Sequence, residues 1–135
     1  MQETGTTATT MPGTVEQYGV FEVALSGRTA GNPFTDCTIS GNFSSDQESI
    51  RVDGFYDGDG TYRVRFMPSH TGRYVWRVEG SFSDTVHEGT FVVTPAREGN
   101  HGPVRVANRH HFAYADGTPY LPFGTTCYVW THQPE

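Results

Sequence analysis

Short segments of alternating apolar and polar residues run through the first 95 residues of the chain. The clearest is Thr61–Phe66, in which Tyr62, Val64 and Phe66 alternate with two arginines. Alternation with a period of two predicts a half-buried antiparallel strand. The preceding stretch, Asp57–Gly60, contains two Asp-Gly pairs, which tolerate the positive φ angles of tight hairpin turns. We therefore expect a hairpin at this point.

Five further segments are predicted to be strands, and each ends at glycine, proline or polar turn residues. They are Val15–Leu25, Phe34–Phe43, Ser49–Phe55, Arg73–Glu79 and His87–Thr94. No run of helical periodicity is long enough for a three-turn helix, so the pattern predicts an all-β fold, an antiparallel β-sandwich of two sheets. The predicted inward positions of these five segments are Phe21, Val23, Leu25, Cys37, Ile39, Phe43, Ile50, Val52, Tyr74, Trp76, Val78, Phe91 and Val93.

Composition divides the chain into four parts. Residues 1–14 are rich in Thr and Gly and have little to bury, which predicts a disordered tail. Residues 15–95 hold the sandwich, and residues 96–102 form a polar linker. Residues 103–135 contain short apolar pieces, interpreted as a hairpin arm that runs into the start of another apolar strand. Because nothing follows that strand to pair with it, we interpret it as the severed edge of a second domain.

Charge and apolar content narrow the range of partners. The formal net charge is −6, and the nine basic residues are all arginines spread along the chain. Nucleic acid needs a concentrated basic patch, so it is not an expected partner. No segment approaches the roughly 18 apolar residues of a membrane helix, so a membrane is not expected either. Met1–Pro12 lacks the features of a secretory signal, and both a cytoplasmic and an exported location stay open.

Metal-binding chemistry is weakly supported. Asp57 and Asp59 resemble part of a calcium loop, but the twelfth position of that loop would be Pro68 instead of an acid, which favours a plain hairpin turn. His110 and His111 are adjacent, and adjacent strand residues face opposite sides of a sheet, so we expect no shared metal ion and a packed His111. We predict no metal and no cofactor.

Catalytic and sugar-binding residues are also hard to select. Asp53 with Asp57, or Glu79 with Glu88, could be an acid pair for glycoside cleavage, but nothing in their spacing selects a pair, so we predict no catalytic residue.

The aromatic residues could form a sugar-stacking platform, for which Tyr56 and Trp76 are the candidates. Most aromatic residues alternate in phase with core positions, which favours packing; Tyr56 lies beside the turn and could be exposed.

Seven segments with distinctive sequences occur in order along residues 15–130. They are Val15–Glu22, Gly31–Phe34, Gly54–Pro68, Gly72–Tyr74, Gly102–Val106, His111–Tyr120 and Gly124–Tyr128. Together they resemble the DUF5060 domain, an Ig-like β-sandwich at the N-terminus of predicted glycoside hydrolases. In that family the sandwich precedes a (β/α)8 barrel of the DUF4038 or apiosidase-like kind, which carries the catalytic carboxylates.

The resemblance implies a function without a catalytic site. It implies that the chain is an accessory and structural module, which packs against a catalytic barrel that the chain itself lacks, and that no catalytic residue can be transferred to it. The alternative is a carbohydrate-binding module that targets the parent enzyme to a polysaccharide glycan.

The C-terminal arm is the expected interface in either case. Its apolar side chains would lose their barrel partners in this chain, and exposed apolar surface tends to find another surface. We expect the arm either to fold back on its own sandwich or to pair with a second chain, as a homo-oligomer formed at an open sheet edge. The interface residues would be Leu121, Phe123, Tyr128, Val129 and Trp130.

Overall fold

The computed structural model describes residues 8–10 and 13–126. The chain divides into two units, Met1–Asn100 and His101–Glu135, and the boundary falls inside the stretch predicted to be a linker. The first unit is a β-sandwich, and the second is built on a hairpin. Nearly all regular structure in both units is strand, so the predicted all-β class is confirmed. None of the helices among these residues is long and apolar enough to cross a membrane.

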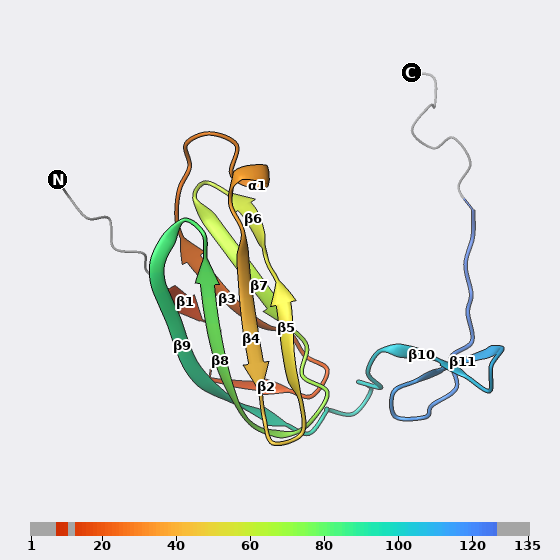
Figure 1. The fold of residues 1–135 in the computed structure, drawn as a ribbon. Helices are drawn as coiled ribbons and strands as arrows, with labels where there is room; N and C mark the ends of the chain where they lie inside the picture. Colours follow the sequence, from red (N-terminus) through yellow and green to blue (C-terminus); the bar gives the residue numbers. More distant parts are fainter. Residues whose placement is uncertain (1–7, 11–12, 127–135) are drawn as a thin grey trace, which may run out of the picture. The chain divides into compact units, whose positions relative to one another are not determined.

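Two sheets form the sandwich (Figure 1). The first has the order β1 (Ala8–Thr10), β3 (Phe21–Ser26), β7 (Thr61–Phe66) and β6 (Phe55–Gly58). The second has the order β2 (Thr14–Glu16), β9 (Ser83–Thr94), β8 (Gly72–Gly80), β4 (Ile39–Ser44) and β5 (Ser49–Asp53). The β2–β9 pair is parallel and the other pairs are antiparallel. This order matches the ABED and GFC sheets of immunoglobulin domains, with β2 and β5 as added edge strands.

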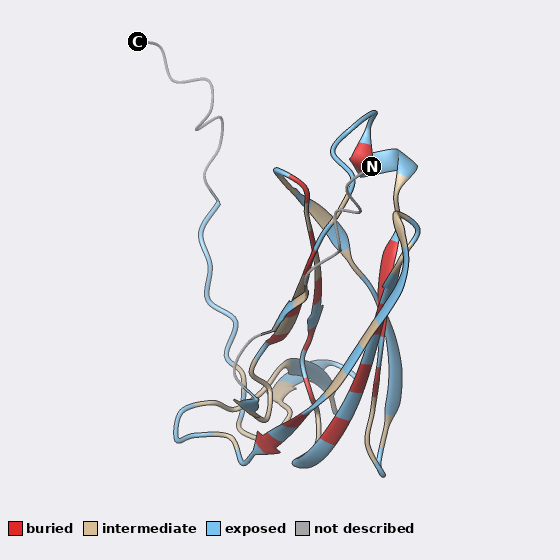
Figure 2. Cartoon of the chain, turned by 90° about the vertical axis from the view of Figure 1, so that its left-hand side faces the viewer, coloured by how far each residue is buried: buried red, intermediate tan, exposed pale blue. Residues whose placement is uncertain are grey.

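The core lies between the two sheets and follows the predicted alternation. In Figure 2, buried and exposed positions alternate along the strands of both sheets. Pairing between β3 and β7 sets Phe21 opposite Phe66, and Val23 opposite Val64, so one face of the pair is apolar. Among the described residues, thirteen buried side chains form one hydrophobic cluster: Phe21, Val23, Leu25, Ile39, Phe43, Tyr62, Val64, Phe66, Tyr74, Trp76, Val78, Phe91 and Val93.

Stacked rings fill the centre of this core. The ring centroids of Phe21 and Phe91 are 3.9 Å apart with nearly parallel planes, and those of Phe43 and Phe66 are 4.5 Å apart. Each pair joins one sheet to the other, because Phe21 and Phe66 belong to the first sheet and their partners to the second. Aromatic pairs of this kind add about 0.5–1.5 kcal/mol beyond the area that they bury.

The structure corrects three predicted strands. Val15–Leu25 is two strands, because Tyr18 adopts a positive φ of 63° and the chain turns there between sheets. Phe34–Phe43 begins as the single helical turn α1 (Pro33–Asp36), with proline at its first position, where the missing N–H costs nothing. Ser49–Phe55 is divided between β5 and β6, which lie in different sheets.

Two predictions of burial and order are also wrong. Ile50 is exposed instead of inward, because β5 is the edge strand of its sheet. The disordered tail predicted for residues 1–14 contains β1, which pairs with β3, and the first residue of β2. Ala8 packs against the core, so even this Thr-rich segment has an apolar contact.

The second unit is a two-stranded hairpin of β10 (Val104–Ala107) and β11 (His111–Tyr114). Pro119 forms a further bridge to Ala113, so the chain folds back once more along the hairpin. No residue between His101 and Thr126 is buried. A two-stranded hairpin without a packed face is marginally stable in water, so this unit depends on other contacts.

Candidate functional site

Trp76, one of the two residues proposed for sugar stacking, belongs to the core. It is 5% exposed, and its ring centroid lies 6.3 Å from that of Phe21. Gly89, opposite Trp76 on β9, leaves space for the indole, since a β-carbon there would lie 2.8 Å from the Trp76 ring. The prediction of Trp76 as a surface platform is therefore wrong, because its place in the β8 alternation faces the other sheet.

Tyr56, the other candidate, is half-buried and supports its surroundings. Its hydroxyl accepts a hydrogen bond from the backbone N–H of Gly60 at 3.0 Å. Its ring lies 4.9 Å from the ring of Tyr62 and 5.0 Å from that of Phe34, at 86° to the latter. Tyr56 therefore fixes the β6–β7 turn and supports Phe34, a residue that sequence reasoning did not single out.

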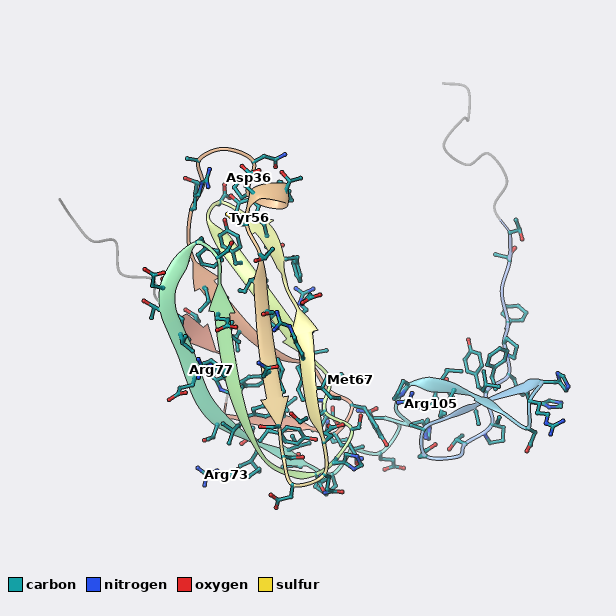
Figure 3. The ribbon with its side chains drawn as sticks, viewed as in Figure 1. Asp36, Tyr56, Met67, Arg73, Arg77 and Arg105 are labelled. Carbon is teal, nitrogen blue, oxygen red and sulfur yellow. The ribbon has the colours of Figure 1, made fainter. Side chains whose placement is uncertain are left out.

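Phe34 completes a row of aromatic rings at one end of the sandwich. We call this row the aromatic end; its members are Phe34, Tyr56, Tyr62 and Phe82. The row runs from Phe82, stacked on Tyr62 at 3.9 Å, to Phe34, which is 72% exposed. Figure 3 shows Tyr56 and the neighbouring Asp36 at this end. The available sequence signal was a large apolar residue next to a Gly/Asn/Pro-rich loop, and the strand predicted for Phe34–Phe43 begins at this residue.

The loop that carries Phe34 is fixed by hydrogen bonds along its length. At its start, Gly27 donates to the carbonyl of Gly60 at 2.8 Å, and the hydroxyl of Tyr62 donates to the carbonyl of Arg28 at 2.7 Å. Burial, reinforced by the neighbouring thiol of Cys37, raises the pKa of Tyr62, so its hydroxyl remains a donor. The loop is thereby tied both to the core and to the β6–β7 turn.

Asp36 closes the same loop. One carboxylate oxygen accepts the backbone N–H of Asn32 at 3.0 Å, and the other accepts the hydroxyl of Thr35 at 3.1 Å. These two hydrogen bonds, in that order of importance, lower the pKa of Asp36, with a smaller contribution from Arg28. The guanidinium of Arg28 lies 3.8 Å from the Asp36 carboxylate and also donates to the carbonyl of Ala30 at 2.8 Å.

Of the two acid pairs considered for catalysis, Asp53 and Asp57 are divided between the two sheets. Asp57 accepts a hydrogen bond from Arg63 at 2.5 Å on the first sheet, whereas Asp53 lies 4.0 Å from Arg51 on the second. Glu79 and Glu88 are exposed on neighbouring strands of the second sheet. Among the described residues, no group of three or more His, Cys, Asp or Glu could hold a metal ion.

Glu22 connects two arginines on the outer face of the first sheet. It accepts hydrogen bonds from Arg63 and from Arg65, the latter at 2.6 Å. Burial acts to raise the pKa of Glu22, but the hydrogen bonds and charges of the two arginines outweigh it, so the pKa is lowered. This network extends to Asp57 through Arg63 and keeps the outer face of β3, β6 and β7 fixed.

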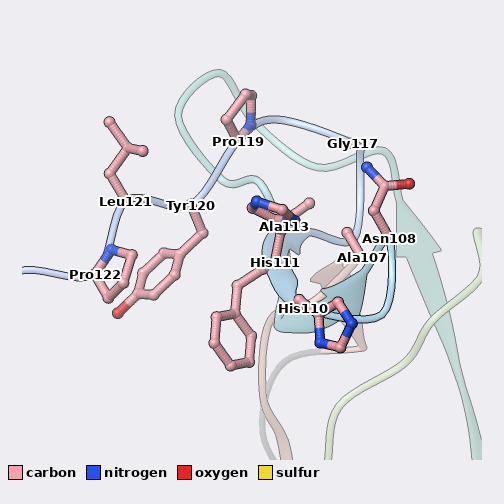
Figure 4. Close-up of a pocket in the computed structure, with 11 residues that line it drawn as sticks. Ala107, Asn108, His110, His111, Ala113, Gly117, Pro119, Tyr120, Leu121 and Pro122 are labelled. Carbon is pink, nitrogen blue, oxygen red and sulfur yellow. The ribbon is translucent and has the colours of Figure 1, made fainter.

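The hairpin unit has a groove with a mostly apolar lining. Its volume is about 630 Å³, and Figure 4 shows the residues around it. The lining includes His110, His111, Phe112, Tyr120, Leu121 and Pro122. His111 is exposed, so the prediction that it is packed is wrong; a hairpin without a buried face offers it nothing to pack against.

Polar contacts hold the hairpin unit together. Nδ1 of His101 lies 2.7 Å from a carboxylate oxygen of Asp116, whose other oxygen accepts the backbone N–H of Thr118 at 2.9 Å. The Thr118 N–H first, and then His101, lower the pKa of Asp116 to about 2. The rings of Tyr114 and Tyr120 meet edge to face at 5.4 Å.

The apolar side chains of the arm remain uncovered in this unit. Leu121 is 85% exposed and Phe123 is 99% exposed. The other predicted interface residues, Tyr128, Val129 and Trp130, lie outside the described residues. A surface of this kind is rare on a protein that has no further partner.

The chain is similar to a known domain family and to a solved structure. A family model described as "Domain of unknown function (DUF5060)" matches residues 14–81. No curated protein matches the chain. A solved structure from Bacteroides vulgatus ATCC 8482, described as a "putative glycoside hydrolase", is 46% identical with a TM-score of 0.80. The match covers 90% of this chain and 24% of that one, so the chain spans about a quarter of that protein's length.

Proposed function

The chain belongs to the DUF5060 family, and from that premise we propose that it is a non-catalytic accessory module of a glycoside hydrolase. The module would pack against the enzyme's catalytic domain, a (β/α)8 barrel of the DUF4038 or apiosidase-like kind, and brace it. Two findings support this proposal. The similar protein from Bacteroides vulgatus is about four times as long as the matched part, and the acids that could have served catalysis here are paired with arginines or face solvent.

One observation carries the proposal: the hairpin unit exposes apolar side chains and buries none of its described residues. Val106 and Phe112 face each other across the hairpin in the β10–β11 register, and both are exposed. An unfilled apolar face on an element this small is explained by a partner surface that covers it. We propose that this partner is a catalytic barrel that follows the sandwich in the parent protein.

Substitution in the parent enzyme tests this role. Phe112→Ser and Val106→Ser should lower the melting temperature of the enzyme, because each removes apolar contact with the barrel. Val75→Ser is the matched control, since Val75 is about as exposed as Phe112 but belongs to β8 of the sandwich. Equal effects of Phe112→Ser and Val75→Ser would contradict docking through the hairpin.

Activity measurements test the non-catalytic part of the proposal. The chain alone should not turn over aryl glycosides, whereas the parent enzyme should. Turnover by the chain alone that is lost on Asp57→Asn or Glu88→Gln would overturn the proposal. Arg63→Met serves as a control in that experiment, because it disturbs the same ion-pair network and leaves every carboxylate in place.

A further inference from the structure

The aromatic end displays its most exposed ring on a fixed support. Phe34 has the highest exposure of the large apolar side chains in the described part of the sandwich. The loop beneath it is also one of the most heavily hydrogen-bonded loops of this unit. A flexible loop would let such a ring fold inward, whereas this loop holds it out. Pre-ordered exposed aromatic residues are typical of binding surfaces, because little conformational entropy is lost on binding.

The geometry of Phe34 and Tyr56 leaves a flat ring face open. The two rings are nearly perpendicular, with centroids 5.0 Å apart. In an edge-to-face pair at most one face of either ring is covered by the other. At least one face of Phe34 is therefore not covered by Tyr56, and the side chain is 72% exposed. Tyr56, held by Gly60 and Tyr62, prevents the ring from collapsing toward the core.

Polar groups on the same loop could recognise hydroxyl groups. Arg28 and Asp36 meet above Gly31: a β-carbon at Gly31 would lie 2.6 Å from the Arg28 guanidinium and 2.9 Å from the Asp36 carboxylate. The two side chains are each about half exposed, at 49% and 43%, and their ion pair is long at 3.8 Å. Each therefore keeps hydrogen-bonding capacity that a ligand could use.

Local charge argues against an acidic ligand. Arg28 is already matched by Asp36, and the adjacent β6–β7 turn adds Asp57 and the exposed Asp59. Arg63 neutralises Asp57 but is itself shared with Glu22. With a formal net charge of −6 on the whole chain, this end offers no excess of positive charge to a carboxylate or sulfate group.

We propose that the aromatic end is a binding site for an uncharged polysaccharide, in which one sugar ring stacks on the free face of Phe34. The C–H face of a pyranose ring matches a flat aromatic surface, and its hydroxyl groups match the guanidinium and carboxylate of Arg28 and Asp36. The choice of a sugar rests on the proposed function of the parent protein, whereas the exposed ring and its support do not.

Affinity electrophoresis of the whole chain tests the site. The gels would contain barley β-glucan, galactomannan or arabinoxylan as neutral probes and polygalacturonate as the acidic one. We expect at least one neutral polysaccharide to retard the chain. Phe34→Ala should weaken that retention at least about tenfold, Phe34→Trp should retain it, and Arg28→Ala and Asp36→Asn should each weaken it by a smaller factor.

Matched controls separate binding from folding and from docking. Phe55→Ala removes another exposed phenylalanine, on β6, and should leave retention unchanged. Phe34→Ala should leave the unfolding midpoint nearly unchanged, because the ring is mostly exposed. The hairpin variants Val106→Ser and Phe112→Ser should bind the polysaccharide as the unaltered chain does, so failure of docking and failure of sugar binding are distinguishable.

Three results would overturn the inference. They are no retention by any neutral probe, retention by polygalacturonate alone, and retention that survives Phe34→Ala. Backbone amide shifts in NMR titrations with an oligosaccharide of the retained polymer give a second measurement. They should concentrate in residues 27–36 and 58–60, and shifts confined to any other part of the chain would also contradict the site.

Discussion

The sandwich and the hairpin unit are held together in different ways. The sandwich has a hydrophobic cluster of thirteen buried side chains among its described residues, whereas the hairpin unit buries no described residue. Both contain strands, turns and aromatic contacts, so local structure does not distinguish them. The difference is a second layer: each sheet of the sandwich covers the other, whereas the described residues of the hairpin unit form a single two-stranded sheet. The sandwich therefore has an apolar core of its own, whereas the apolar side chains of the hairpin unit are uncovered among the described residues.

Ion pairs and hydrogen bonds fix the local geometry of both units, but only the sandwich also has an apolar core. In the sandwich, Glu16 pairs with Arg97 at 2.7 Å and ties β2 to the segment after β9. In the hairpin unit, Asp116 with His101 and Thr118 has the corresponding role. Exposed ion pairs contribute little to stability by themselves, so they can fix a geometry but cannot replace a core. Such contacts therefore hold the local geometry of the hairpin unit but do not give its described residues an apolar core.

The largest expected effect is on the core. Phe91→Ala should lower the free energy of unfolding by about 3–5 kcal/mol, because it removes a ring stacked on Phe21 and leaves a cavity. The corresponding change in the hairpin unit, Phe112→Ala, should alter that free energy by less than about 0.5 kcal/mol. Urea denaturation followed by circular dichroism measures both. Similar losses of unfolding free energy for the two variants would contradict the expected difference between the sandwich and the hairpin unit.

A smaller effect is expected where the chain crosses between the sheets. Gly54 separates β5 from β6, and a β-carbon there would lie 2.3 Å from the carbonyl oxygen of Arg63. Gly54→Ala should therefore destabilise the chain by about 1–3 kcal/mol through forced backbone movement. Gly13→Ala is the control, since a β-carbon at Gly13 would have no atom within 4 Å. A Gly54→Ala variant as stable as the unaltered chain would show that the backbone between β5 and β6 moves at little cost.

Hydrogen exchange sharpens the comparison without any substitution. Amides of β8 and β9 should exchange only on global unfolding, because these strands lie beside buried rings. Amides of β10 and β11 should exchange through local opening at a far lower free energy. If protection of the hairpin amides against exchange rises with protein concentration, a second copy covers the hairpin, as expected for a homo-oligomer. Light scattering on the same samples separates a monomer from a dimer.

The smallest effect concerns pH. The hydrogen bonds from the Arg97 side chain and backbone lower the pKa of Glu16 from its ordinary 4.5 to about 2. A lowered pKa in the folded state stabilises the fold above the ordinary pKa, and that contribution is lost as pH falls from about 4.5 to about 2. Glu16 should thus add to the acid sensitivity of the sandwich, whereas protonation of Asp116 should loosen the hairpin unit alone.

NMR titration of the two carboxyl groups checks this difference. Arg97→Met should raise the pKa of Glu16 and leave that of Asp116 unchanged. His101→Gln should raise the pKa of Asp116 only partly, because the backbone N–H of Thr118 is the larger cause of its low value. A Glu16 that titrates near its ordinary pKa in the unaltered chain would contradict the ion pair.

Sequence patterns predicted the sandwich better than they predicted any site. The alternation in β3, β7, β8 and β9 identified buried side chains such as Phe21, Val64 and Phe91, since a strand between two sheets exposes only every second residue. The same rule placed Trp76 in the core, and the structure confirms that placement against its use as a sugar platform. It failed for Ile50, because alternation cannot tell an edge strand from a central one.

The sequence by itself determined the fold class and which side chains of the central strands face the core, because both follow from a period of two in apolar residues along one strand. Only the tertiary structure decided that Tyr18 and Gly54 are places where the chain changes sheets. It also decided that Phe34 is held outward while Trp76 is covered. These outcomes depend on which segments distant in the sequence pack together, and a single period along one strand carries no information about its neighbours.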